Sequence, residues 1–163
     1  GSQYVKMLAT VKDLPAVQDM LATAQEILGW DVLELCQHGP EAKLEETKYC
    51  QPAMFIAGLA GIEKLKVGKK PEHASRFGYA AGLSLGEYTA LCAAGVFTFE
   101  DGLKLVKLRG EAMSEAAQVG KQAMLSVAGI PKEELLELCQ QAVERTGSSE
   151  VCAIANELFP KGF

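Results

Sequence analysis

The sequence has few of the residues that build metal and disulfide sites. Only two histidines and five cysteines occur among 163 residues, and no two cysteines have a Cys-x-x-Cys spacing. An odd number of widely spaced cysteines argues against both a zinc site and a disulfide framework. We therefore expect no metal site, and reduced, mostly buried thiols in a reducing compartment.

Other absences exclude further classes of protein. No apolar run reaches the roughly 20 residues that a membrane-spanning helix needs. The net charge of −5 disfavours nucleic acid as a partner, because nucleic acid selects basic surfaces. No internal repeat occurs. The composition, 48% hydrophobic and 23% charged, is that of a globular protein.

Helical periodicity covers much of the chain up to residue 120. Apolar spacing predicts a helix over residues 15–28 that ends at Gly29. Pro52 is placed in the first turn of another helix, and Thr98 begins a sequence that resembles a capping box. The further helices expected by the same criteria lie near Glu41 and over 51–66, 85–94 and 98–117.

The pattern changes after Gly120. Residues 122–129 and 150–157 are expected to form strands on either side of a helix over 131–145, and an earlier buried strand is expected over 76–81. These features predict an α/β protein with a domain boundary near residue 120, so that the domains are 1–120 and 121–163.

A glycine–serine motif lies where the strand is expected to pass into a helix. Gly82, Ser84 and Gly86 form the pattern Gly-x-Ser-x-Gly, which is typical of a nucleophile elbow. The glycines allow a sharp turn and close packing. The backbone N–H of Leu85, at the helix N-terminus, is placed to stabilise an oxyanion. The alternative is a serine with a structural role in a turn.

One arginine is predicted to lie in an apolar stripe. At about 100° per residue, Arg109 falls among Gly102, Leu105, Val106, Ala112 and Met113, opposite Lys104, Lys107 and Glu111. A buried guanidinium needs an anion. That anion is either a carboxylate such as Glu87 or the carboxylate of a substrate.

Two segments together, "GLSLGEYTAL" and "FEDGLKLVKLRGEAM", resemble malonyl-CoA:acyl-carrier-protein transacylases of the bacterial and plastid type. The stretches "GSQYVKM" and "GPEAKLEETKYCQPAMF" extend the resemblance over nearly the whole chain. The resemblance implies an α/β-hydrolase-like large domain with an inserted ferredoxin-like small domain. Residues 1–120 would be the N-terminal part of the first, and 121–163 the first half of the second.

The resemblance also implies a reaction and its residues. Ser84 would accept the malonyl group from malonyl-CoA and pass it to the phosphopantetheine thiol of acyl carrier protein. Arg109 would hold the malonyl carboxylate, Met113 would line the pocket, and the Leu85 N–H would supply half of the oxyanion hole. No metal or cofactor is implied. The expected protein is a monomer of the plastid or cytoplasm, with no membrane or nucleic acid partner.

Two further residues are weaker site predictions by position. Gln51 is expected either to face the active-site cleft or to cap its helix. Asn156, at the end of the second small-domain strand, is expected to face the cleft by analogy with the family. Glu87 is expected to have a structural role at the helix N-terminus.

The chain departs from the family at three points. Leu83 stands where many members have His, and Gln3 matches the second glutamine of the amino-terminal motif rather than the oxyanion glutamine. The catalytic histidine has no counterpart, because His38 and His73 both lie in expected loops. We therefore expect an incomplete copy of a longer protein, without transacylase turnover by itself.

Three alternatives remain open from the sequence. A serine esterase would use Ser84 but would have no use for Arg109. An acyltransferase domain of a polyketide synthase would share both residues. A non-catalytic, carrier-binding paralogue would bind carrier protein without acylation of Ser84.

Overall fold

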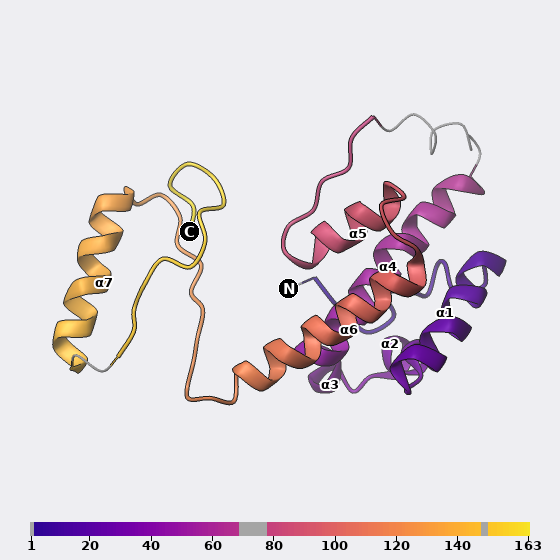
Figure 1. Ribbon diagram of the computed structural model, residues 1–163, viewed down its shortest axis with the longest axis horizontal. Helices are drawn as coiled ribbons and strands as arrows, with labels where there is room; N and C mark the ends of the chain where they lie inside the picture. Colours follow the sequence, from indigo (N-terminus) through magenta and orange to yellow (C-terminus); the bar gives the residue numbers. More distant parts are fainter. Residues whose placement is uncertain (1, 69–77, 148–149) are drawn as a thin grey trace. The chain divides into compact units, whose positions relative to one another are not determined.

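The computed structural model describes residues 2–68, 78–147 and 150–163. The chain divides into two compact units, Gly1–Gly120 and Lys121–Phe163. Six helices of the first unit and one of the second are shown in Figure 1. They are α1 (Pro15–Leu28), α2 (Val32–His38), α3 (Glu41–Glu45), α4 (Thr47–Lys66), α5 (Leu85–Ala93), α6 (Phe99–Ala116) and α7 (Lys132–Thr146).

Helix α4 is the centre of the first unit. It packs against α1, α3, α5 and α6, and its apolar residues join the main hydrophobic core. The Phe55 ring of α4 stacks on Phe99 of α6 with ring centroids 5.9 Å apart. A Cβ at Gly102 would lie 2.7 Å from the Phe55 ring, so glycine at this position allows α6 to approach α4 closely.

Most of the predicted helices are confirmed, with two differences. The boundaries of α1 are those expected, and Thr98 caps α6 by accepting a hydrogen bond from the Asp101 N–H at 3.1 Å. Helix α4 begins at Thr47, so Pro52 lies inside the helix and not in its first turn. Helix α2 was not predicted, although Asp31 caps it by accepting from the Glu34 N–H.

The predicted strands are wrong where the structure describes them. Residues 76 and 77 lie outside the described residues, and 78–81 are in no strand. Residues 122–129 and 150–157 do not pair with each other. Instead, Val127 exchanges both backbone hydrogen bonds with Phe163, and Ala128 bridges to Gly162. An extended segment becomes a strand only when a neighbour satisfies its backbone groups along its length.

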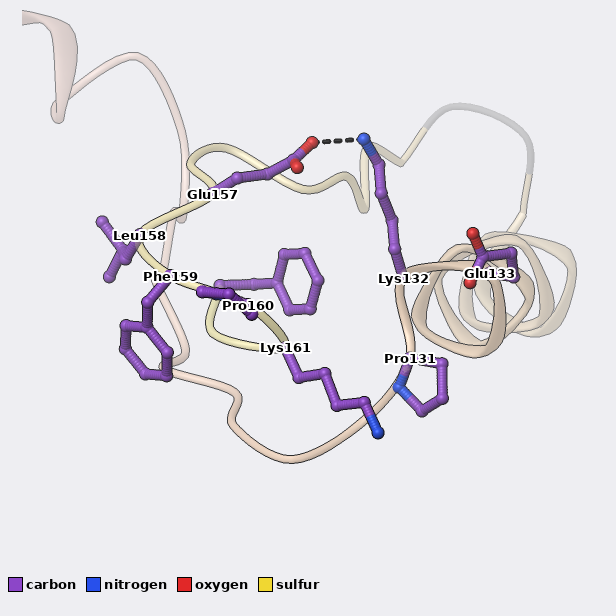
Figure 2. A pocket seen from close by; sticks show the side chains of 9 residues that line it. Pro131, Lys132, Glu133, Glu157, Leu158, Phe159, Pro160 and Lys161 are labelled. Carbon is purple, nitrogen blue, oxygen red and sulfur yellow. Dashed lines mark hydrogen bonds and ion pairs between the residues drawn. The ribbon is translucent and has the colours of Figure 1, made fainter.

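The second unit has an open pocket of about 510 Å³ at the start of α7 (Figure 2). The Lys132 ammonium pairs with the Glu157 carboxylate across this pocket. The contact ties the first turn of α7 to the segment that precedes the terminal turn. Asn156 lies in this segment and is exposed.

Candidate active site

Ser84 stands at a strained turn immediately before α5. Its backbone has φ 54° and ψ −109°, values that a non-glycine residue rarely adopts. Such strain gathers at functional sites, where the surrounding structure holds it in place. The Gly86 N–H donates to the Leu83 carbonyl at 2.8 Å, and the Glu87 N–H donates to the Ser84 carbonyl at 3.1 Å. The turn therefore has its own hydrogen bonds.

The two glycines of the motif differ in what they permit. A Cβ at Gly82 would lie 1.9 Å from the carbonyl carbon of Gly86, which no side chain can accommodate without moving the backbone. A Cβ at Gly86 would meet nothing within 4 Å. Close packing of the turn on the first residues of α5 thus depends on Gly82.

Leu85 is the first residue of α5. Backbone N–H groups in the first turn of a helix have no intrahelical acceptor, and they carry the positive end of the helix dipole. The next two N–H groups bond to Leu83 and Ser84, as above. The Leu85 N–H is the backbone amide that follows Ser84 directly in the chain.

The Arg109 side chain of α6 reaches the serine. Its Nη2 donates to Ser84 Oγ at 2.8 Å, and its Nη1 donates to Gln51 Oε1. The guanidinium carbon also lies 5.7 Å from the centroid of the Tyr88 ring. The sequence predicted Ser84 and Arg109 separately, and the structure brings them into contact.

Arg109 makes no ion pair with any carboxylate among the residues that the structure describes. The alternative in which Glu87 neutralises it is therefore not observed. Glu87 is exposed and lies in the first turn of α5, where a negative charge favours the helix dipole. A half-buried guanidinium that contacts only neutral groups keeps its charge available for an anion.

Gln51 is the one buried polar residue in the described part of the chain, with 6% of its surface exposed. It lies inside α4, so the alternative of a helix cap is wrong. Its Nε2 donates to Met113 Sδ at 3.3 Å while its Oε1 accepts from Arg109. Because a thioether only accepts, these two contacts orient the amide with its oxygen toward the guanidinium.

The buried face of α6 is rotated about the helix axis relative to the predicted apolar stripe. The buried residues are Gly102, Leu103, Val106 and Gly110. Leu105 and Met113 are 46% and 45% exposed, and Ala112 is exposed as well. Arg109 lies at the edge of the buried stripe and is half-buried. Helix α6 packs against α4, α1 and α5.

Only one of the two histidines lies among the residues that the structure describes. His38 is the last residue of α2 rather than part of a turn; it is exposed, and its Nδ1 lies 2.9 Å from Glu34 Oε2. His73 lies outside the described residues. The structure gives no contact between His38 and Ser84.

The thiols differ in burial. Burial raises the pKa of the Cys36 thiol to about 12, and the pKa values of Cys50 and Cys92 are raised for the same reason. Only Cys36 is buried; Cys50, Cys92 and Cys139 are half-buried and Cys152 is exposed, so the expectation of mostly buried thiols is wrong. Within the described ranges, no three metal-binding side chains cluster together, and no helix is both long and apolar enough to cross a membrane.

The comparison with protein families identifies the family of the chain. The family described as "Acyl transferase domain" matches residues 1–151.

The chain belongs to the acyl transferase domain family.

Individual members of the family extend this result. The chain is 42% identical to the mitochondrial malonyl-CoA-acyl carrier protein transacylase of Homo sapiens, over 98% of this chain and 42% of that protein. The malonyl-CoA:acyl carrier protein transacylase structure from Xanthomonas oryzae matches with a TM-score of 0.81 and 40% identity, over 99% of this chain and 49% of that one.

A third match is a malonyl-transacylase solved in complex with a type II polyketide synthase acyl-carrier protein. It has a TM-score of 0.74 and 38% identity, over 89% of this chain and 46% of that one. These likenesses show the acyltransferase fold. The acyl transferase chain spans less than half the length of the curated relatives it matches.

Tyr88 is the site residue that the sequence analysis missed. It is part of the quoted segment "GLSLGEYTAL" and lies four residues after Ser84. One helical turn separates these positions, so an aromatic residue there was a signal that it faces the same side of the helix.

Proposed function

We propose that this chain carries the acyl-binding part of a malonyl-CoA:acyl-carrier-protein transacylase of fatty-acid biosynthesis. One observation supports this most directly. A guanidinium with no carboxylate partner in the described residues donates a hydrogen bond of 2.8 Å to the hydroxyl of the elbow serine. An acyl group that carries its own carboxylate would meet both groups at once.

The proposed reaction has two halves. Ser84 Oγ attacks the thioester carbonyl of malonyl-CoA, and the Leu85 N–H stabilises the oxyanion. The carbon–sulfur bond breaks, and coenzyme A leaves as its thiol with the proton lost by the serine. The phosphopantetheine thiol of acyl carrier protein then attacks the malonyl-serine ester. The new thioester forms, and the proton returns to Ser84.

Arg109 would select the acyl group by charge. The malonyl carboxylate accepts from the guanidinium in a bidentate arrangement, which acetyl cannot do. Met113 is proposed to line the same acyl pocket, because its sulfur contacts Gln51, which also binds Arg109. Asn156 is proposed to line the cleft on the evidence of family position alone. No cofactor is proposed, since malonyl-CoA is a substrate.

The same family relationship supports a proposal for the finer fold. We propose that residues 1–120 form part of an α/β-hydrolase-like large domain, and 121–163 part of a ferredoxin-like small domain. The partners proposed are malonyl-CoA and acyl carrier protein, and the protein is proposed to act as a monomer. The plastid and cytoplasm remain proposals for its location, and the human relative is named as mitochondrial.

Calorimetric titration of the 163-residue chain with malonyl-CoA and acetyl-CoA tests the proposal. We expect tighter binding of malonyl-CoA, and loss of that preference in Arg109→Ala. Arg109→Lys keeps the charge but not the fork, so it should retain only part of the preference. Equal binding of the two thioesters by the unmodified chain would overturn the proposal and would favour an esterase.

A second candidate differs only in the carrier. The match to a transacylase bound to a type II polyketide carrier protein supports malonyl transfer for polyketide synthesis. Titration of the chain with fatty-acid and polyketide carrier proteins distinguishes the two. Tighter binding of the polyketide carrier would favour this second function.

A further inference from the structure

Arg109 contacts three neutral groups, and one of them is the hydroxyl proposed to react. Nη2 donates to Ser84 Oγ at 2.8 Å, Nη1 donates to Gln51, and the guanidinium lies over the Tyr88 ring. When the serine becomes acylated, Oγ is bonded to the acyl carbon and faces the new ester. An ester oxygen is a weaker acceptor than a hydroxyl, so acylation weakens the hold of the serine on the guanidinium.

We propose that Tyr88 is the positioning residue that holds the Arg109 guanidinium for an anionic acyl group. This inference rests on the proposed function and names a determinant of its specificity. The Tyr88 ring offers its π-face 5.7 Å from the guanidinium carbon, within the range of a cation–π interaction. The ring attracts the cation without neutralising it, so the positive charge stays available to the substrate.

The position of Tyr88 suits this role. It lies on α5 one turn after Ser84, and its half-buried side chain packs against the main hydrophobic core. Core packing fixes the ring, because a packed aromatic side chain has few rotamers. Helix α5, which begins directly after Ser84, therefore also fixes the Tyr88 ring that faces the Arg109 guanidinium. Gln51 approaches the guanidinium separately, from α4.

Binding of malonyl-CoA and acetyl-CoA to the 163-residue chain measures the effect. Tyr88→Leu removes the π-face, and we expect malonyl-CoA binding to weaken about three- to tenfold while acetyl-CoA binding stays unchanged. Tyr88→Phe keeps the π-face and should bind both as the unmodified chain does. A purely structural role would instead weaken the binding of both thioesters together.

Tyr49 provides a matched control. It is also half-buried beside the core, and the ammonium groups of Lys43 and Lys48 each lie 4.9 Å from its ring centroid. Tyr49→Leu removes a comparable ring together with its two cation–π contacts, and this ring has no contact with Arg109. We expect it to leave the preference for malonyl-CoA intact. Loss of the preference in this variant would overturn the assignment to Tyr88.

A fluorinated series keeps the test valid if Tyr88→Leu does not fold. Phenylalanine analogues with one, two and five ring fluorines at position 88 preserve the shape of the ring while they withdraw charge from its face. The preference for malonyl-CoA should fall stepwise with fluorination. A constant preference across the series overturns the inference alone. Equal binding of both thioesters by the unmodified chain overturns the proposed function as well.

Discussion

Gln51→Glu changes the charge beside Arg109 while it nearly preserves side-chain size. In the structure the Gln51 oxygen accepts from Arg109 Nη1, and the amide nitrogen donates to Met113. A carboxylate in its place accepts from the same guanidinium and forms an ion pair. Arg109 keeps the charged form of that carboxyl favoured, so its pKa falls and it stays ionised at neutral pH. The local positive charge is then cancelled.

The cost to malonyl binding follows from Coulomb's law. Two carboxylates that share one guanidinium lie roughly 5 Å apart, and at an effective dielectric constant of about 20 they repel by roughly 3 kcal/mol. That energy corresponds to about a hundredfold loss of affinity for malonyl-CoA. Acetyl-CoA has no carboxylate and should bind as before. Gln51→Glu should therefore remove the malonyl preference.

Calorimetric titration of both thioesters measures this effect, with a thermal melt to show that the variant folds. Gln51→Met is the control, because it is of similar length and neutral. This variant removes one hydrogen bond to Arg109 but leaves the positive charge of the guanidinium uncompensated. We therefore expect the affinity for malonyl-CoA to fall only about three- to tenfold. If a folded Gln51→Glu variant binds malonyl-CoA like the unmodified chain, Arg109 does not bind the substrate carboxylate.

Three other predictions test the elbow and the core. Gly82→Ala should lower the free energy of unfolding by at least about 2 kcal/mol in urea denaturation, whereas Gly86→Ala, whose Cβ meets nothing within 4 Å, should not. Burial raises the pKa of Cys36 to about 12 and favours the neutral thiol, so Cys36 should resist iodoacetamide at pH 8 while the exposed Cys152 reacts. Equal labelling of the two cysteines in mass spectrometry would contradict this prediction. The thiol introduced by Ser84→Cys should be alkylated faster than Cys152, since the adjacent guanidinium and helix N-terminus favour a thiolate; equal rates would show that this field is absent.

The helices could be predicted because their signals are local. Pro15 and Gly29 mark the ends of α1, and Thr98 caps α6 through a residue three positions away. Helix α2 was missed although it carries such a signal, with Asp31 three residues before Glu34. A helix of seven residues shows less than two full periods of apolar spacing, so its periodicity is weak.

The strands could not be predicted in the same way. A strand depends on the segment that pairs with it, and residues 127–129 pair with 161–163, a segment in which no strand was predicted. Local alternation of apolar residues does not identify the partner. The stripe on α6 was rotated for a related reason, because the sequence does not show which side of a helix its neighbours will cover.

The site was predictable one residue at a time but not as a set of contacts. Ser84 lies in a Gly-x-Ser-x-Gly motif, and helical spacing places the charge of Arg109 among apolar residues. The contacts of Arg109 with Gln51 and Tyr88 depend on how α4, α5 and α6 pack, and the positions are separated by 58 and 21 residues. No local pattern encodes such a separation, so the network required the structure.

The neutrality of the Arg109 contacts links selectivity to stability. A hydroxyl, an amide oxygen and an aromatic face hold the guanidinium, yet none of them compensates its charge. Partial burial of an uncompensated charge costs free energy in the folded protein, and a carboxylate beside Arg109 would relieve that cost. Such a carboxylate would also occupy the place of the acyl anion. Under the proposed function, these neutral contacts leave an electrostatic cost that an anionic acyl group relieves on binding, and a neutral acyl group cannot.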